Sequence, residues 1–330
     1  MESKMKQNTV ATTNTTTENA ASRPHILAAI DIGSNGARLL IKRFDSSAPE
    51  FERIRRLMFI RVPLRLGKDV FTLGRISKER QEMMFHMMKG FKHFMLLNKV
   101  EDYRACATAA MRDAGNGMRM MEMIEKKTGI TLEIIRGEEE AKLLFNNIVE
   151  NPEYACGNYA YVDVGGGSTE ISLLRDGELI ESHSFNMGTL RLLNGEVSPE
   201  TRSEMLDMLN RHKEKYPQTT MIGSGGNINK LYKLTRGEQD TKVMKVSDMR
   251  AIYEDLAKLT MEQRRERYGL KEDRADVIIP ASEVFLLVAG ALGCDTITVP
   301  NISLADSIVD GLYRDKFIRK SKQEEPENEP

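Results

Sequence analysis

The sequence predicts an α/β protein with two copies of one element order, βββαβαβα, that face each other across a cleft. Two observations carry this prediction. A buried strand that ends in Asp and is followed by glycines and small polar residues occurs twice, at residues 29–36 and 159–170. After each of these loops come two further strands, and then strands that alternate with helices. Such a repeat is typical of an internal duplication, in which the two loops occupy equivalent places.

The first copy is expected to occupy residues 25–150, and its helices have clear boundary signals. Ser77 is a favourable N-cap, because a serine side chain accepts a hydrogen bond from a free N–H of the first helical turn. Gly129 suits the left-handed position that ends many helices. The expected strands are 25–32, 38–44, 52–62, 103–107 and 131–135, and the expected helices are 77–98, 113–128 and 138–150.

The second copy is expected to occupy residues 151–320. Asp176-Gly177 is typical of a two-residue hairpin turn, and Pro199 fits the first position of a helix. An insertion at about 236–293 is expected to be helical, with a capping box at Thr260 and Gln263. The expected strands are 159–164, 170–174, 178–185, 219–222 and 296–299, and the expected helices begin at 198 or cover 226–234, 275–292 and 304–317.

Connection lengths predict how these strands pair. Strands joined by tight turns should run antiparallel and strands joined by helices should run parallel, so each copy should form a mixed sheet flanked by helices. Whether the last helix packs on its own copy or back on the first one is left open.

Composition indicates a globular protein and excludes some partners. The chain has 330 residues, 40% of them hydrophobic, and a formal net charge of −1. No global field therefore attracts it to nucleic acid or to a membrane. The three cysteines are far apart and form no CxxC pair, as expected for reduced cytoplasmic thiols.

The ends of the chain are expected to lie outside the fold. Residues 1–24 are polar and lack the apolar core of a signal peptide, so they are expected to be a disordered tail. Residues 321–330 are expected to be a charged tail. The most apolar stretch, residues 284–293, is too short to span a bilayer. We therefore expect a cytoplasmic protein.

The Asp–Gly loops have the chemistry of a phosphate site. Backbone N–H groups of Gly165, Gly166 and Gly167 can turn toward an anion, and glycine permits the positive φ values that such a nest needs. Ser168 adds a hydroxyl donor. Asp163 and Glu170 are oxygen ligands of the kind that Mg²⁺ prefers. A lone loop of this type would more often be an ordinary turn, but the repetition favours phosphate binding.

Three further segments suit the same chemistry. Residues 223–226 join a strand to a helix N-terminus, which is a favourable place for an anion. Arg112 can place a guanidinium fork on phosphate oxygens, and Arg191 is expected to face the cleft. Glu138 and Glu139 are explained by the dipole of the helix that they begin. The sequence contains no P-loop, no dinucleotide-binding glycine pattern and no zinc-type histidine motif.

The duplicated layout is similar to that of the actin, sugar-kinase and heat-shock-chaperone ATPase superfamily, whose domains are ribonuclease H-like. Within it, five segments in order resemble the exopolyphosphatase / guanosine pentaphosphate phosphohydrolase (Ppx/GppA) family. They are residues 30–35 with Arg38, residues 107–116, residues 137–141, residues 163–170 and residues 223–226. The resemblance covers about residues 26–318.

This resemblance implies a role for each site residue. Glu140, which directly precedes Ala141, is the implied catalytic base. Asp163 and Glu170 are the implied metal and water-positioning carboxylates, with Mg²⁺ as the cofactor. The implied phosphate-binding residues are Asp31, Gly33, Ser34, Asn35, Arg38, Arg112, Gly165, Gly166, Gly167, Ser168, Gly223, Ser224, Gly225 and Gly226.

The chain also departs from the family pattern. Gly36 stands where the family usually has Ser, and Asn227 stands where it usually has Thr. Longer members carry a C-terminal helical domain that helps to hold long polyphosphate. We therefore expect a short two-domain member that prefers short phosphate chains, unless a homodimer builds a longer channel.

The sequence thus predicts a Mg²⁺-dependent phosphohydrolase that releases terminal phosphate from inorganic polyphosphate or guanosine pentaphosphate. Two alternatives remain at this stage. One is a kinase or polyphosphate-dependent phosphotransferase of the same superfold, although no sugar-pocket base is evident. The other is a non-catalytic sensor of polyphosphate or of a guanosine alarmone, which the intact carboxylates disfavour.

Overall fold

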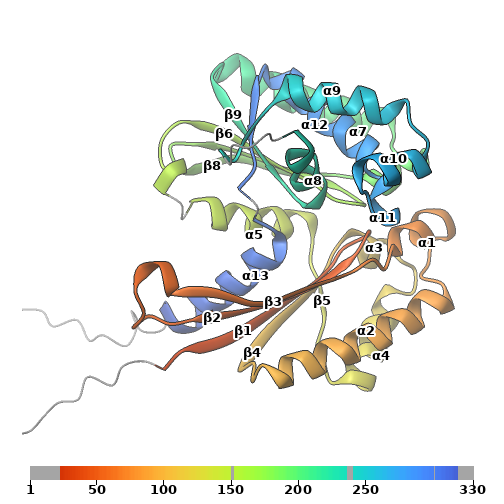
Figure 1. Ribbon diagram of the computed structural model, residues 1–330, viewed down its shortest axis with the longest axis vertical. Helices are drawn as coiled ribbons and strands as arrows, with labels where there is room; N and C mark the ends of the chain where they lie inside the picture. The colour runs from red at the N-terminus through yellow and green to blue at the C-terminus, as the bar shows by residue number, and fades with distance from the viewer. Residues whose placement is uncertain (1–22, 150–151, 236–240, 301, 319–330) are drawn as a thin grey trace, which may run out of the picture.

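The computed structural model describes residues 23–149, 152–235, 241–300 and 302–318. Apart from residues 23 and 24, the two expected tails lie outside the described residues. The chain forms two sheets with helices around them, one in each lobe of the molecule (Figure 1). This confirms the duplicated α/β architecture.

The first sheet has the strand order β3-β2-β1-β4-β5. Its hairpin strands pair antiparallel, and β1, β4 and β5 run parallel because helices connect them. Buried apolar side chains of β1 and β2 pack on α2 and α4. The strands are β1 (His25–Ile32), β2 (Ala37–Phe44), β3 (Ile54–Val62), β4 (Asp102–Ala107) and β5 (Glu133–Ile134), and the helices are α1 (Leu66–Leu73), α2 (Lys78–Leu97), α3 (Ala109–Asp113), α4 (Gly117–Thr128) and α5 (Gly137–Val149), with a 3-10 turn at Glu50–Glu52.

The helices of this domain follow the sequence signals, with two corrections. Ser77 caps α2 by accepting a hydrogen bond from the Arg80 N–H, and Gly129 ends α4 in the left-handed conformation. The helix expected at 113–128 is α4, which begins at Gly117, and a separate short helix, α3, precedes it. Asn116 lies in the break, where its side-chain amide hydrogen-bonds both backbone groups of Ile76 at 2.9 Å. Helix α1 was not expected at all.

The second sheet has the order β10-β11-β9-β6-β7-β8. Asp176 and Gly177 turn the β7–β8 hairpin with φ values of 49° and 78°, as a primed turn requires. The expected helical insertion also contributes a strand, since β10 pairs antiparallel with β11. The strands are β6 (Asn158–Val164), β7 (Thr169–Arg175), β8 (Glu178–Phe185), β9 (Thr219–Ser224), β10 (Val243–Lys245) and β11 (Thr296–Thr298).

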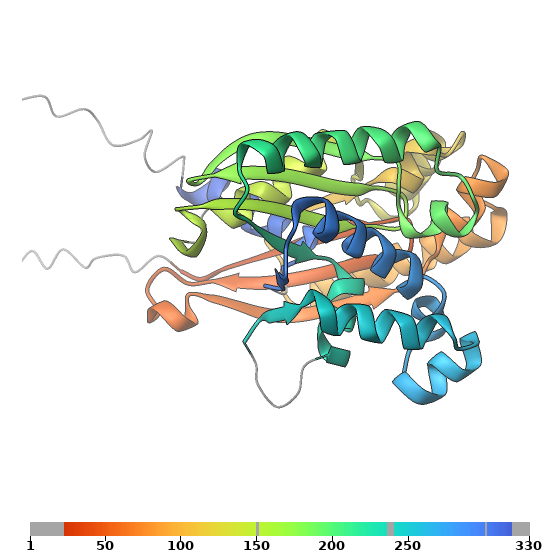
Figure 2. The same ribbon diagram turned by 90° about the horizontal axis from the view of Figure 1, so that it is seen from above.

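Most helices of the second domain lie on the side of its sheet that faces away from the first domain (Figures 1 and 2). Thr260 and Gln263 form the expected capping box, and Ser198 caps the helix that starts at Pro199. The helices are α6 (Thr189–Leu193), α7 (Pro199–Lys215), α8 (Gly226–Thr235), α9 (Val246–Ala257), α10 (Met261–Tyr268), α11 (Glu272–Ala275) and α12 (Ile278–Leu292), and a 3-10 turn covers Pro152–Tyr154.

One described helical stretch, Glu272–Leu292, is long and apolar enough to cross a bilayer by length and composition. This run is longer than the apolar stretch that the sequence indicated. Its most apolar window is 67% buried inside the protein. It packs against α7, α8 and α9, as a core helix does.

Two helices lie between the sheets and join the domains. α5, from the end of the first copy, packs on β7 and β8 of the second sheet, and α13 (Leu304–Tyr313) packs on β1, β2 and β4 of the first sheet. A shared apolar cluster contains Leu27, Tyr161, Leu144 and Ile308. Asp310 of α13 accepts a hydrogen bond from Lys42 Nζ at 2.9 Å. Each copy thus contributes one helix to the contact between the two sheets.

Candidate active site

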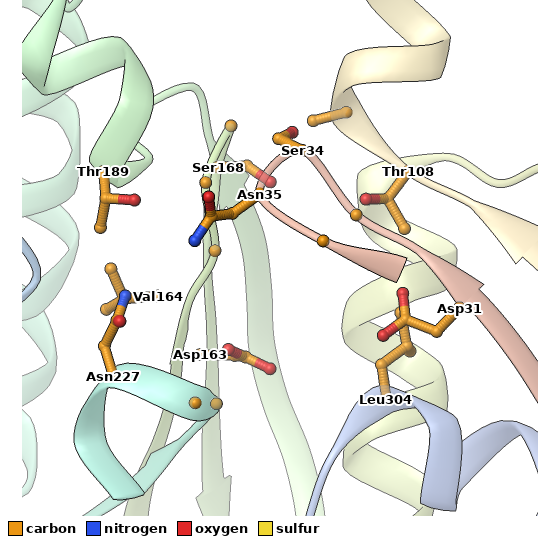
Figure 3. Close-up of a pocket in the computed structure, with 18 of the residues that line it drawn as sticks. Asp31, Ser34, Asn35, Thr108, Asp163, Val164, Ser168, Thr189, Asn227 and Leu304 are labelled. Carbon is orange, nitrogen blue, oxygen red and sulfur yellow. The ribbon is translucent and has the colours of Figure 1, made fainter. Parts of the chain in front are cut away.

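The two Asp–Gly loops meet in a narrow cavity between the domains, which we call the inner pocket (Figure 3). Its volume is about 70 Å³, and it opens into an outer pocket of about 360 Å³. Residues of both sheets, of α5 and of the N-termini of α8 and α13 contribute to its walls. The predicted site residues that line it are Asp31, Gly33, Ser34, Asn35, Arg38, Glu140, Asp163, Gly165, Gly166, Gly167, Ser168, Glu170, Gly225 and Gly226.

The two loops have the same backbone turn. The Gly33 N–H donates to the Gly36 carbonyl at 3.1 Å, and the Gly165 N–H donates to the Ser168 carbonyl at 2.9 Å. Strand register extends the likeness, because Asp31 stands opposite Arg38 just as Asp163 stands opposite Glu170. The duplication therefore places a cation on one wall of the pocket and a second carboxylate on the other.

The glycines serve close packing here, which corrects the reason expected from the sequence. None of Gly33, Gly165, Gly166 and Gly167 has a positive φ, so no left-handed nest forms at these positions. A Cβ at Gly167 would lie 2.6 Å from both Ser34 Oγ and Ala109 Cβ. Side chains on Gly166 or Gly167 would therefore push the two loops apart.

Four carboxylates surround the inner pocket, and three of them have raised pKa values. Glu140 projects from the first turns of α5, is 9% exposed, and its Oε2 has no hydrogen-bond partner. Burial raises the Glu140 pKa well above its usual range, and the charges of Glu170, Asp31 and Asp163 raise it further. Burial likewise raises the pKa of Glu170, and it raises the pKa of Asp163 to about 6.

Hydrogen bonds orient the two carboxylates that the sequence assigned to a metal. Glu170 Oε1 accepts from Ser184 Oγ at 2.7 Å, and Asp163 Oδ2 accepts from Ser224 Oγ at 3.3 Å. Among the described residues, no group of three or more His, Cys, Asp and Glu is arranged to hold a metal ion. Asp163 and Glu170 nevertheless suit Mg²⁺, which binds proteins through one or two carboxylates and takes its other ligands from phosphate and water.

Several buried polar atoms of the pocket lack a partner. Ser34 Oγ, Asn35 Oδ1 and Thr189 Oγ1 make no hydrogen bond within the described protein. Buried polar groups are normally satisfied, so these atoms indicate a polar ligand. Thr108 and Thr189 line the pocket as well, and sequence reasoning missed both. The short helices that they precede or begin gave no periodic signal.

The predicted arginines divide into two groups. Arg38 lines the inner pocket and pairs with Asp31. Arg112 lies behind the carboxylates, where it donates to the Ile135 carbonyl at 2.9 Å and lowers the pKa of Glu140 and Glu170 by its charge. Arg191, expected to face the cleft, instead donates to the Gly167 carbonyl at 2.8 Å and pairs with Asp113. It supports the glycine loop from outside the pocket.

The loop at residues 223–226 also has a divided role. Gly225 and Gly226 line the inner pocket. Gly223 instead packs under Ile228 and Ile297, where a Cβ would approach within 3.0 Å of both side chains. The Ser224 hydroxyl hydrogen-bonds Asp163 Oδ2 and the Ile302 carbonyl.

The outer pocket is strongly basic. Six cationic side chains line it together with Arg38: Arg56, Arg61, Lys230, Lys233, Lys271 and Arg274. Burial, together with repulsion from Arg61 and Arg38, lowers the pKa of Arg274 to about 10. The sequence showed the basic run that contains Arg56 and Arg61, but it did not show that these residues meet Arg274 and the lysines of α8.

Ion pairs hold the two domains together across the cleft. Arg61 of β3 pairs with Asp273 of α11 at 2.5 Å, and Arg65 pairs with Asp276. Asn35 donates to the Asp273 carbonyl at 3.2 Å. These contacts join the two domains beside the inner pocket, and the outer pocket adjoins it through shared lining residues.

Comparison with known proteins gives consistent matches. The Ppx/GppA phosphatase family matches residues 46–314. Exopolyphosphatase 2 of Mycobacterium tuberculosis is 28% identical over 312 residues, which cover 86% of this chain and 97% of that protein. Guanosine-5'-triphosphate,3'-diphosphate pyrophosphatase of Aeromonas hydrophila is 22% identical over 87% of this chain, but the match covers 59% of that longer protein.

Solved structures agree with the fold. A crystal structure of an exopolyphosphatase from Cytophaga hutchinsonii superposes with a TM-score of 0.75 and 23% identity, over 88% of this chain and 97% of that one. The Aquifex aeolicus member of the Ppx/GppA family superposes with a TM-score of 0.70 and 24% identity, over 89% and 99% of the two chains.

Proposed function

The chain belongs to the Ppx/GppA phosphatase family, and on this basis we propose that it hydrolyses the terminal phosphoanhydride bond of a linear phosphate chain. The observation that carries the proposal is the position of Glu140. Its unpartnered Oε2 is buried in a pocket whose other walls are phosphate-type loops with unsatisfied donors and acceptors. A carboxylate in that place can take a proton from an attacking water.

The proposed reaction follows from the groups around the terminal phosphate. Glu140 accepts a proton from water, and the water oxygen then attacks the terminal phosphorus. The bond to the bridging oxygen breaks, and that oxygen stays on the shortened chain. The loop N–H groups and Arg38 stabilise charge on the transferring oxygens, which is most of what phosphoryl transfer needs.

The raised pKa of Glu140 suits this role. A carboxylate with an ordinary pKa is a weak base, whereas burial and neighbouring carboxylates make ionised Glu140 a stronger one. Arg112 limits the effect, because its charge lowers the same pKa.

Asp163 and Glu170 are proposed to hold Mg²⁺ when substrate binds. The bound cation would neutralise charge on the terminal phosphate oxygens. Both carboxylates are buried, and burial raises both pKa values, so a nearby cation would stabilise their ionised forms.

The outer pocket supports a substrate with several phosphates in a row. Its cations continue from Arg38 of the inner pocket to Arg56 and the lysines of α8, so the rest of the chain would lie there. Inorganic polyphosphate and guanosine pentaphosphate both offer such a chain. Phe59, 45% exposed at the same pocket, offers an aromatic surface that a nucleoside would use and inorganic polyphosphate would not.

The test is phosphate release from both substrates, measured side by side with and without Mg²⁺. We expect release from at least one of them, and loss of that release on chelation. Transfer of phosphate to an acceptor such as ADP without net release would contradict the hydrolase proposal and support a phosphotransferase.

A further inference from the structure

A third cavity lies next to the catalytic carboxylates and shares no lining residue with the outer pocket. This rear cavity has a volume of about 410 Å³ and is lined by residues at the start of α5 and near the end of β8. Its lining includes Arg112, Arg136, Glu138, Ser184 and Asn186. None of these residues lines the inner or the outer pocket.

The wall between the rear cavity and the inner pocket is thin. Ser184 lines the rear cavity, and its hydroxyl donates at 2.7 Å to Glu170, which lines the inner pocket. Gly137 lines the rear cavity and lies one helical turn before Glu140. A Cβ at Gly137 would lie 2.4 Å from Ser184 Oγ. The catalytic carboxylates therefore separate the two spaces.

The charge of the rear cavity suits a small anion. Arg112 and Arg136 line it, against the single carboxylate of Glu138. His183 also lines it and is paired with Glu181 at 2.9 Å. Arg112 is close enough to Glu140 and Glu170 to lower both pKa values, so its charge acts on both sides of the wall.

The positions of the inner pocket, the outer pocket and the rear cavity limit how the cleaved phosphate can leave. The inner and outer pockets share Arg38, Arg61 and Arg274, so the phosphate chain would enter from that side. Glu140 and Glu170 line only the inner pocket. A terminal phosphate cut off beside them would have the shortened chain between itself and the entrance.

We propose that the rear cavity is an orthophosphate site, in which Arg112 and Arg136 receive the cleaved phosphate so that it leaves without passing the remaining chain. The proposal rests on the proposed hydrolase function. It needs the Glu140 and Glu170 side chains to part. Glu140 Oε2 has no hydrogen bond to lose, and the hydrogen bond from Ser184 Oγ to Glu170 would break. After Glu140 has taken the proton from water, it is neutral and does not repel the departing phosphate.

The first test measures orthophosphate binding while the front of the site is filled. The protein is saturated with a methylene-bridged triphosphate that cannot be hydrolysed, and labelled orthophosphate is added in equilibrium dialysis. We expect one orthophosphate per chain in the wild type. Arg136→Gln should weaken its binding about tenfold or more, because a charge-assisted hydrogen bond is lost, and Glu138→Gln should strengthen it.

The matched control is Arg119→Gln, which removes an exposed arginine of α4 that lines none of the cavities described above. It should bind orthophosphate like the wild type. Absence of orthophosphate binding to the saturated protein, or equal binding by Arg136→Gln and the wild type, would overturn the rear site. If the triphosphate analogue itself does not bind, the proposed function fails, and the variants are compared with orthophosphate alone.

The second test measures the exit by kinetics. Asn186→Trp should fill the rear cavity from its exposed rim, with Asn186→Ala as the control of small size. We expect the tryptophan variant to keep its single-turnover rate and to lose several-fold in multiple-turnover rate. Equal losses in both rates, or none in either, would contradict an exit through this cavity. A wild type that hydrolyses neither substrate would defeat the proposed function and leave the dialysis result to decide the site.

Discussion

At the scale of residues, the site concentrates negative charge that the folded protein alone does not neutralise. Asp31 is paired with Arg38, but Asp163 and Glu170 have hydroxyl partners, and Glu140 Oε2 has none. Burial of such groups disfavours their charged forms and costs stability. Such a cost is expected at a site that binds a charged ligand, as the proposed function requires.

Asp163→Asn should show this cost as a stability difference that depends on pH. The folded-state pKa of Asp163, about 6, lies above its ordinary 3.8, so the folded protein binds the extra proton and stability falls as pH rises between these values. The neutral amide avoids that loss, and we expect it to stabilise the Mg²⁺-free protein at pH 8 by about 3 kcal/mol at most, with no gain at pH 4.

Thermal unfolding at the two pH values measures this effect. Asp207→Asn, an exposed change on α7, is the control and should not show a gain in stability at pH 8 over pH 4. Equal or lower stability of Asp163→Asn at pH 8 would mean that the folded protein does not disfavour the charged form of Asp163, which would contradict its raised pKa.

The pH dependence of catalysis should report Glu140. Because burial and three carboxylates raise its pKa above the ordinary 4.5, the base is protonated and inactive at low pH. We expect kcat/KM to rise with pH through a midpoint above 4.5. An acid limb with its midpoint at or below 4.5 would contradict the assigned environment of Glu140.

At the scale of elements, the sequence predicted the strands well and the short helices poorly. The hairpin strands β1, β2, β7 and β8 begin and end within one residue of expectation, because buried strands have clear apolar patterns and turn signals. α1, α6 and β10 have few residues and are fixed by long-range packing, which no local pattern shows. The break between α3 and α4 depends on Asn116 reaching Ile76, forty positions away.

Two helical glycines test that break by opposite effects. A Cβ at Gly117, the first residue of α4, would lie 2.1 Å from the Met111 carbonyl oxygen, whereas Gly90 in α2 has nothing within 4 Å. We expect Gly117→Ala to lower the free energy of unfolding by about 1–3 kcal/mol. Gly90→Ala should raise it by about 0.5–1 kcal/mol, since alanine favours a helix. Denaturant unfolding of both variants measures the two effects. Effects of the same sign would contradict the close contact between Gly117 and Met111 at the break.

At the scale of the whole molecule, the cleft is the feature that the sequence could least define. The paired loops predicted that a cleft exists and named most of its inner residues. The outer pocket, by contrast, joins Arg56 and Arg61 of β3 to Arg274 and to the lysines of α8, which are far apart in sequence. Only the folded chain brings them together. The same holds for the rear cavity between α5 and β8.

Closure of the cleft should depend on the pair Arg65–Asp276, which joins the domains outside the inner and outer pockets. We expect Arg65→Ala and Asp276→Ala each to raise KM by weakening the closed form. In a double-mutant cycle, the two effects should be non-additive by about 0.5–1 kcal/mol. Strictly additive effects on KM would show that the pair does not couple the domains in solution.

The central claim is that Glu140 is the base of a phosphohydrolase, and one measurement tests it most directly. Phosphate release is measured for the wild type, for Glu140→Gln and for Glu139→Gln, whose side chain is exposed and pairs with Arg104 at 2.7 Å. The amide at 140 keeps the shape of the side chain but cannot take a proton. We predict that Glu140→Gln binds substrate and loses about 10²–10⁴-fold in kcat, while Glu139→Gln stays close to the wild type. A Glu140→Gln protein that keeps more than about half of the wild-type rate would contradict the account.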